Sequence, residues 1–325
     1  MVIARGDTRG ADLVAILEAT YARAPSDEAW LEGVARATRS ALDGGLGVGA
    51  YIYDLRELPM RASTFVNVES PLSAEFVGAV VASATPDYVE KSWKTLSFGA
   101  ASEVPGYDDE IALKAFFRPN GMEDMVAVNA YDPSEATGVW IGAPRKARHR
   151  VRKAERELWG RVSAHIANGY RLRRREAALE AILTTTGKTV HAEGAAKLDD
   201  AREALSEAVR GVERARGVMR ERDPDAAVVS WRALVSARWS LVDHFESDGK
   251  RYLVARTNEP TPRGPTTLTD RERQIVSYAV LGHSAKLIAY ELGIAPSTVR
   301  VLLARAARKL GAKTPDELRV AFEKA

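Results

Sequence analysis

Residues 268–318 have the sequence LTDRERQIVSYAVLGHSAKLIAYELGIAPSTVRVLLARAARKLGAKTPDEL. Their start fits a capping box, in which the hydroxyl of Thr269 accepts from the backbone N–H of Glu272 and the glutamate carboxylate reaches back to the cap. Gly282 and Gly293 each end an apolar helical pattern, because glycine readily adopts the left-handed conformation that closes a helix. We therefore predict a helix, a second helix after Gly282, and a third helix after a short turn.

The third predicted helix has an apolar face and a basic face. Apolar side chains recur at i, i+3, i+4, i+7 and i+11, so we expect them to pack inward. They are Val299, Leu302, Leu303, Ala306 and Leu310. A helix whose outward face is basic fits the major groove of duplex DNA, although other three-helix bundles share part of this spacing.

We expect the outward face of this helix and its flanks to contact DNA. Arg300 and Val301 lie in the first turns, which reach base edges when a helix enters the groove with its N-terminus first. Arginines further along lie nearer to the phosphates, and Ala304 supplies only fit. Phosphate anchors are expected at Lys286 and at the cap region of the helix. The predicted set is Lys286, Ser297, Thr298, Arg300, Val301, Ala304, Arg305, Arg308 and Lys309.

A fourth helix is predicted after Thr314-Pro315-Asp316-Glu317, which combines a cap, a first-turn proline and an acidic third position. Leu318, Ala321 and Phe322 lie on one face of that helix. No partner for this face is evident in its own segment, so we expect it to pair with a second copy of the chain.

These residues resemble the C-terminal helix-turn-helix of LuxR-type (GerE-type) transcriptional regulators. The resemblance is carried by Leu268, Thr269, Arg271, Glu272, Gly282, Ser284, Lys286, Ile288, Ala289, Leu292, Ser297, Thr298, Val299, Lys309, Leu310 and Gly311. It implies a four-helix DNA-binding unit, with the third helix in the major groove and the fourth used for dimerisation. The family often has other residues at Ala285, Leu302 and Ala304, so its base code is not carried over.

Composition excludes several classes of protein. The chain has 325 residues, 46% hydrophobic and 28% charged, which is ordinary for a globular protein. It has no Cys, which excludes disulfide scaffolds, iron–sulfur clusters and thiol nucleophiles. No apolar run approaches the roughly 20 residues of a membrane span, and the first residues lack a secretion signal. We therefore expect a cytoplasmic protein that does not contact a membrane.

Charge is distributed unevenly along the chain. Residues 1–144 hold 11 basic and 21 acidic side chains, residues 145–175 hold 12 and 2, and residues 268–325 hold 10 and 6. Basic clusters favour a nucleic acid as partner, whereas a solvated helix face remains the alternative for residues 145–175.

The front of the chain, residues 1–145, predicts an α+β sensor domain. A helix over Ala29–Leu42 precedes strands at Gly44–Asp54 and Arg61–Val68, and a hairpin joins Met122–Tyr131 to Thr137–Pro144. This order of elements resembles a GAF domain.

Residues 146–182 predict a long basic connecting helix. Its apolar stripe is Val151, Leu158, Val162 and Ile166. We expect this stripe to form a signalling and dimerising surface, with a helix that caps one domain as the alternative.

Residues 183–257 predict a second α+β domain of PAS-like element order, with hairpins at Gly187 and at Asp248-Gly249 and helices between them, the last ending near Ala237. Three prolines in residues 258–267 predict an extended linker. The fold class is therefore multidomain: α+β sensor domains, a connecting helix and an all-α helix-turn-helix over residues 268–325.

The chemistry of the front half does not indicate an enzyme. The sequence contains no recognisable set of a nucleophile, a base and an orienting group. The five histidines lack the spacing of metal ligands, and we expect no cofactor. We predict a DNA-binding transcriptional regulator controlled by an N-terminal sensor, which acts as a homodimer on double-stranded DNA. A small-molecule effector and a contact with RNA polymerase stay open as further partners. The alternative is an enzyme or a protein-docking module that carries a DNA-binding tail.

Overall fold

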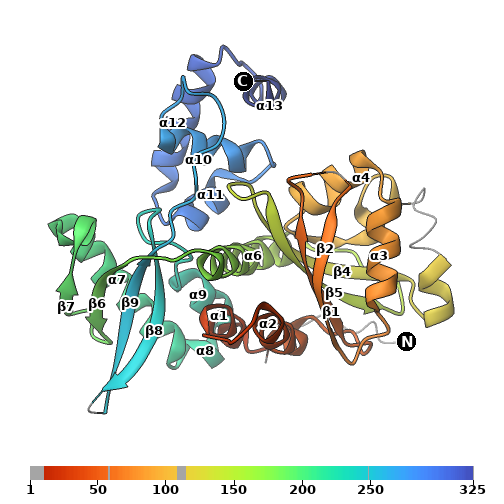
Figure 1. Ribbon diagram of the computed structural model, residues 1–325, viewed down its shortest axis with the longest axis horizontal. Helices are drawn as coiled ribbons and strands as arrows, with labels where there is room; N and C mark the ends of the chain where they lie inside the picture. Colours follow the sequence, from red (N-terminus) through yellow and green to blue (C-terminus); the bar gives the residue numbers. More distant parts are fainter. Residues whose placement is uncertain (1–10, 58, 108–114, 248, 325) are drawn as a thin grey trace.

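The computed structural model describes residues 11–57, 59–107, 115–247 and 249–324. Two antiparallel sheets lie at opposite ends of a helical layer, and the helices of the C-terminal tail lie on one side of that layer (Figure 1). Helices between the sheets therefore connect the two ends of the molecule and support the tail.

The first sheet has the strand order β2-β1-β5-β4-β3. Its strands are β1 (Val48–Asp54), β2 (Arg61–Val68), β3 (Phe98–Ala100), β4 (Asp124–Asp132) and β5 (Thr137–Arg145). The period-two alternation of β1 puts Ala50 and Ile52 on one face and Tyr51 and Tyr53 on the other, and all four side chains are buried. Both faces of this sheet are consequently covered.

Different helices cover the two faces of the first sheet. One face packs against α2 (Asp27–Leu42) and α6 (Lys153–Arg174), and α1 (Leu13–Tyr21) packs against these two helices. The other packs against α3 (Ala74–Ser83), α4 (Pro86–Val89) and a π-helix (Glu90–Thr95). The expected helix before β1 and the expected strands and hairpin are present, whereas α1 and β3 had no prediction.

The second sheet has the order β7-β6-β9-β8. Its strands are β6 (Leu179–Thr184), β7 (Thr189–Ala192), β8 (Trp239–Ser247) and β9 (Lys250–Thr257), and its helices are α7 (Asp199–Arg216), α8 (Met219–Arg222) and α9 (Pro224–Ser230). Both predicted hairpins form, although Asp248 of the second turn lies outside the described residues. The helix expected to end near Ala237 ends at Ser230 instead, where the chain turns to an extended conformation at Trp231 with ψ 108°.

The tail contains α10 (Asp270–Ala279), α11 (Ala285–Leu292), α12 (Pro296–Lys309) and α13 (Pro315–Glu323). All four helices were predicted. Their two apolar clusters join α10 to α11 and to α12, as a helix-turn-helix requires.

Helix α6 is a central core helix, so the expectation of an unpartnered signalling stripe is wrong. Val151, Leu158, Val162 and Ile166 are all buried, and they share one apolar cluster with both sheets. Small residues let other elements approach closely: a Cβ on Gly169 would lie 2.4 Å from Thr20 Cγ2 and 2.7 Å from Thr20 O. The pattern showed which face was apolar but could not show that the same chain covers it.

The proline-rich segment after β9 is held in place along its length, and it is not the free tether that its composition suggests. Arg175 Nη1 donates to the carbonyl of Glu259 over 2.8 Å, and Gln274 Nε2 of α10 donates to the carbonyl of Pro260 over 2.7 Å. Gly264 has φ +107°, and its Cα faces the ring of Phe322 so closely that a Cβ would clash. The segment therefore packs between α6 and the tail.

We predict that Gly169→Ala destabilises the protein by about 1–3 kcal/mol, because the added Cβ must displace the backbone of Thr20. Gly33→Ala is the matched control, since Gly33 also lies within a helix but has no atom near its missing Cβ. That substitution should stabilise slightly, because alanine favours a helix over glycine. Thermal unfolding of both variants checks the prediction, and equal midpoints would show that α1 and α6 do not pack this closely.

Candidate functional site

The capping box of α10 forms and is joined to the end of α12. Thr269 Oγ1 accepts from the backbone N–H of Glu272 at 3.3 Å, and Glu272 Oε2 accepts from the backbone N–H of Thr269 at 2.8 Å. Lys309 Nζ donates to the same Oε2 at 2.6 Å, and this ammonium holds the pKa of the Glu272 carboxyl below its ordinary value. Lys309, expected at the DNA, is thus bound to the buried carboxylate of the neighbouring helix.

Helix α11 is closed at both ends by the predicted residues. Ser284 Oγ accepts from the backbone N–H of Leu287 at 3.2 Å, and Gly293 has φ +61°. A Cβ on Gly293 would lie 1.8 Å from the carbonyl oxygen of Leu234, so the turn also contacts the sensor part. Lys286 is exposed in the first turn of α11.

Helix α12 begins differently from our expectation. Its first residue is Pro296 and its N-cap is Ala295, which has no side-chain cap, so Ser297 and Thr298 lie in the first turn and not at a cap. Proline favours this start because its fixed φ suits the first helical position. The exposed N-terminal backbone groups are consequently available to an anion such as a phosphate.

The inward and outward faces of α12 agree with the helical pattern. Val299 and Ala306 are fully buried, and the three leucines of that face are half-buried. Arg300, Val301, Ala304, Arg305 and Arg308 are all exposed. Within the described part of the chain, none of these arginines has an ion pair or a side-chain hydrogen bond. Their charges therefore face solvent as one basic surface.

The apolar face of α13 has a partner in its own chain. Leu318 and Phe322 pack against a cluster of Leu268, Val276 and Ala306, and Phe322 also covers Gly264. Leu318, Ala321 and Phe322 remain half-buried. Our assumption that this stripe lacks an intrachain partner is wrong, because the linker folds back beneath α13, and dimerisation through it stays a prediction.

Residues 266–320 match the family described as bacterial regulatory proteins, luxR family. The tail is a LuxR-type helix-turn-helix domain. This confirms the resemblance seen in the sequence.

A curated relative of the LuxR-type domain is the transcriptional activator protein BjaR1 of Bradyrhizobium diazoefficiens. It is 49% identical over 59 residues, which are 18% of this chain and 24% of the relative. Two structures of SdiA, one from Escherichia coli and one in complex with octanoyl-rac-glycerol, are each 12% identical. They cover 84% and 85% of this chain, 81% and 80% of their own chains, and have TM-scores of 0.25 and 0.23. Scores of this size do not establish a shared overall arrangement.

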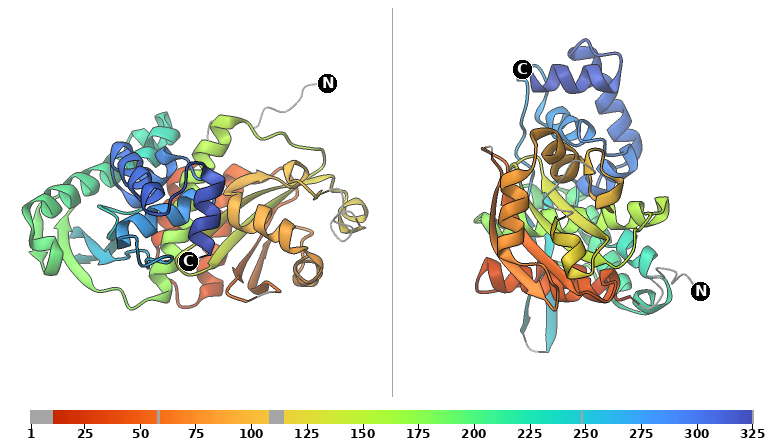
Figure 2. Two further views of the ribbon diagram at one scale, coloured as in Figure 1. Left: turned by 90° about the horizontal axis from the view of Figure 1, so that it is seen from above. Right: turned by 90° about the vertical axis from the view of Figure 1, so that its right-hand side faces the viewer.

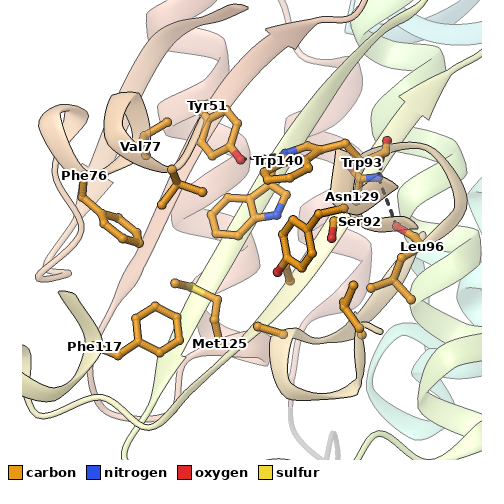
Figure 3. Close-up of a pocket in the computed structure, with 16 residues that line it drawn as sticks. Tyr51, Phe76, Val77, Ser92, Trp93, Leu96, Phe117, Met125, Asn129 and Trp140 are labelled. Carbon is orange, nitrogen blue, oxygen red and sulfur yellow. Dashed lines mark hydrogen bonds between the residues drawn. The ribbon is translucent and has the colours of Figure 1, made fainter. Parts of the chain in front are cut away.

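A pocket lies on the face of the first sheet that α3, α4 and the π-helix cover (Figure 3). Its volume is about 60 Å³. The lining is mostly aromatic and aliphatic: Tyr51, Phe76, Val77, Val80, Tyr88, Ser92, Trp93, Leu96, Gly99, Ala101, Val104, Phe117, Met125, Ala127, Asn129 and Trp140. Sequence analysis missed this pocket, although the apolar character of both faces of β1 was a signal that the sheet is covered on two sides.

The polar groups of the pocket are largely held by each other. Trp93 Nε1 donates to the hydroxyl of Tyr51 at 2.8 Å, and Asn129 Nδ2 donates to the carbonyls of Trp93 and Leu96 at 2.8 and 3.1 Å. Ser92 Oγ is buried and has no hydrogen-bond partner among the described residues. A buried hydroxyl without a partner costs about 1–3 kcal/mol, so Ser92 favours a polar ligand atom beside it.

The described residues include no group of three or more His, Asp or Glu side chains placed to hold a metal ion. No single described helix has the length and hydropathy to cross a membrane, and α11 and α12 reach that threshold only together, across a bend of 110°.

We predict that Lys309→Ala lowers the thermal midpoint, whereas Arg308→Ala leaves it nearly unchanged, because only Lys309 neutralises a buried carboxylate. The loss corresponds to about 1–3 kcal/mol for a buried acceptor deprived of its donor. The pKa of Glu272 is lowered in the folded state, so the difference between Lys309→Ala and the parent should be full at neutral pH and shrink as acid protonates Glu272. Equal midpoints for the two variants at neutral pH would contradict this assignment.

Proposed function

We propose that this chain is a transcriptional regulator that binds duplex DNA through α12 and responds to a small apolar molecule in the pocket of the first sheet. The observation that carries the DNA-binding part is the exposed, unpaired arginine face of α12 within a LuxR-type domain. The match to BjaR1 covers only 24% of that relative. The function proposed for the whole chain is therefore argued from this geometry and not from the relative.

The start of α12 and the residues further along it are expected to contact different parts of the DNA. Arg300 and Val301 lie one turn from the helix start, where a bidentate contact to guanine and a contact to a thymine methyl are within reach. Arg305 and Arg308 lie further along, toward the phosphates that flank the groove, and Lys286 with Ser297 and Thr298 meets phosphates at the helix starts. Ala304 leaves room for the approach of the groove.

We predict that Arg300→Ala weakens specific DNA binding by about 1–3 kcal/mol and relaxes one position of each half-site. Arg308→Ala should instead weaken all sequences about equally, because a phosphate contact carries no base information. Selection of bound duplexes from a random library distinguishes the two variants. An unchanged motif for Arg300→Ala would show that Arg300 contacts phosphate and that the helix is oriented differently.

The same selection tests the proposed homodimer. Two-fold symmetry of the protein requires inverted half-sites about 10 base pairs apart, whereas a monomer selects a single half-site. The half-buried Leu318, Ala321 and Phe322 face supports the dimer, since a second copy would cover its remaining area.

Three observations support a ligand in the pocket. The lining is apolar and aromatic, as in most small-molecule sites, and Ser92 offers a buried hydroxyl. The segment over the pocket contains a π-helix, a form that is frequent at functional sites. The described lining includes no carboxylate, histidine or lysine, so the pocket favours binding over catalysis and over the enzyme alternative.

The size of the pocket sets a condition on its ligand. A volume of about 60 Å³ is well below the roughly 300 Å³ of typical ligand sites, so a ligand must displace the helical cover. Two elements of that cover are short, since α4 has 4 residues and the π-helix has 6. Ligand binding is therefore expected to reshape residues 86–97.

We predict that linear alkanols from hexanol to dodecanol raise the thermal midpoint of the protein, since a ligand that binds only the folded state stabilises it by mass action. Ala127→Leu fills the pocket and should abolish this rise while DNA binding is retained. Ala154→Leu adds the same side chain at an exposed position of α6 and serves as control. Equal responses of both variants would place the ligand elsewhere.

A further inference from the structure

The basic run of residues 145–175 is only partly used inside the protein. Arginines in the second half of α6 pair internally, as in Arg171 with Asp132 at 2.8 Å and Arg173 with Asp27 at 3.3 Å. Cations at the start of the helix lie instead beside the tail. This leaves Lys153, Arg156 and Arg161 without a part in the proposed DNA site.

Two hollows lie between the sensor part and the tail. The first, of about 300 Å³, lies between the start of α6, residues 95–98 and the start of α11. The second, of about 440 Å³, lies between Arg161, Arg232 after α9, and the start of α12 at Pro296. Arg161 and Lys286 line both hollows, so the two adjoin. We call them together the junction furrow.

The junction furrow is strongly cationic. Its described lining carries Lys153, Arg156, Arg161, Arg232 and Lys286, and the only carboxylate in that lining is Glu157. Three of these cations have partners of their own. Arg156 donates to the carbonyl of Phe98 and pairs with Glu103 Oε2 at 3.1 Å, the guanidinium of Arg161 lies 5.9 Å from the ring centroid of Tyr290, and Arg232 Nη2 lies 3.3 Å from Glu207 Oε1.

Glu103, Glu157 and Glu207 supply three carboxylates against the five cations, so an excess of positive charge remains in the furrow. The side chains of Lys153 and Glu157 are 91% and 59% exposed and their closest N–O distance is 4.0 Å, so this pair is weak in water. Arg161 and Lys286, which line both hollows, have no ion pair among the described residues, so the furrow attracts an anion most strongly where the two hollows adjoin.

The position of the furrow relates it to the proposed DNA groove. It opens at the first turns of α11 and α12, and the positive ends of two helix dipoles meet its cations there. A duplex read by the first turns of α12 brings the phosphates that flank the groove past these helix starts. Helix α11 packs against α6, and the right-hand view of Figure 2 shows the C-terminal helices, in blue, on one side of the rest of the chain.

We propose that the junction furrow binds the phosphate backbone of the DNA that flanks the site read by α12, so that the sensor part itself contacts DNA. The proposal rests on the proposed DNA-binding function and adds a second, sequence-independent surface to it. Its partner is duplex DNA outside the half-site, held by Lys153, Arg161 and Arg232.

The furrow also adjoins the pocket of the first sheet. Leu96 lines both the pocket and the furrow, and Asn129 in the pocket holds the carbonyl of Leu96 at 3.1 Å. A ligand that displaces residues 86–97 therefore changes the wall of the furrow. Such a change alters the contact with flanking DNA without movement of α12.

The test compares the salt dependence of DNA binding for the full chain. Lys153→Gln with Arg232→Gln removes two furrow cations, and Arg36→Gln with Lys250→Gln removes two exposed cations from other elements as a charge-matched control. On a duplex of about 40 base pairs, the slope of log affinity against log salt should fall by about 0.9 for each lost phosphate contact, hence by about 1.8 for the furrow variant. On a duplex trimmed to the half-sites, the furrow variant should bind like the parent.

Equal slopes for the furrow and control variants on the long duplex would overturn the proposal. The proposal would also be overturned if the furrow variant bound the trimmed duplex more weakly than the parent does, because flanking DNA would then not be the partner. Lys153→Gln alone, at a side chain that is 91% exposed, keeps the fold intact and should lower the slope by about 0.9. Absence of binding by the parent to any duplex would instead refute the proposed function.

Discussion

The guanidinium of Arg171 joins the parts of this protein. It is 1% exposed at the C-terminal end of α6, and its Nη1 donates to Asp132 Oδ2 at the end of β4 over 2.8 Å. Its Nε donates to Asn258 Oδ1 after β9 over 3.0 Å, and the phenol of Tyr278 in α10 interacts with the same group. Both sheets, the core helix and the LuxR-type domain thus meet at one buried cation.

A buried charge of this kind is held only when its partners are complete. Taking a guanidinium and a carboxylate out of water costs several kcal/mol, and the loss of one partner typically costs 3–5 kcal/mol. Asn258 adds to the network, because its Nδ2 donates to the carbonyl of Asn168 and to Ser240 Oγ, both at 2.8 Å. The start of the proline-rich segment is therefore anchored, and this anchor explains why the tail lies against α6.

A second buried cluster holds the helix-turn-helix to the sensor part. The Tyr290 hydroxyl of α11 lies 2.7 Å from His165 Nε2 and 2.6 Å from the carbonyl oxygen of Val228. Burial lowers the pKa of His165 to about 3, so this histidine is neutral at physiological pH and acts as a hydrogen-bonding group. Because α11 is held on α6, the furrow and the outward face of α12 have fixed positions relative to each other.

Local sequence patterns were sufficient to predict the four helices of the tail. Capping residues, the glycines at the helix ends and the i, i+3, i+4 spacing act over a few residues, so they could be recognised without knowledge of the rest of the chain. The same is true of the strands and hairpins, except for short β3. The residues proposed to contact DNA follow from the face of α12 that is not apolar, although the true partner of Lys309 and the true cap of α12 depend on neighbouring helices.

The pocket, the furrow and the burial of α6 required the folded chain. Tyr51, Trp93 and Asn129 meet in the pocket from three elements, and Arg161 and Lys286 meet in the furrow from two parts of the molecule. An apolar stripe such as that of α6 shows that a face must be covered, but hydrophobic burial is not directional and does not specify its partner. Which surface covers which, and where space remains, depends on long-range packing, and that is why the linear pattern could not locate these sites.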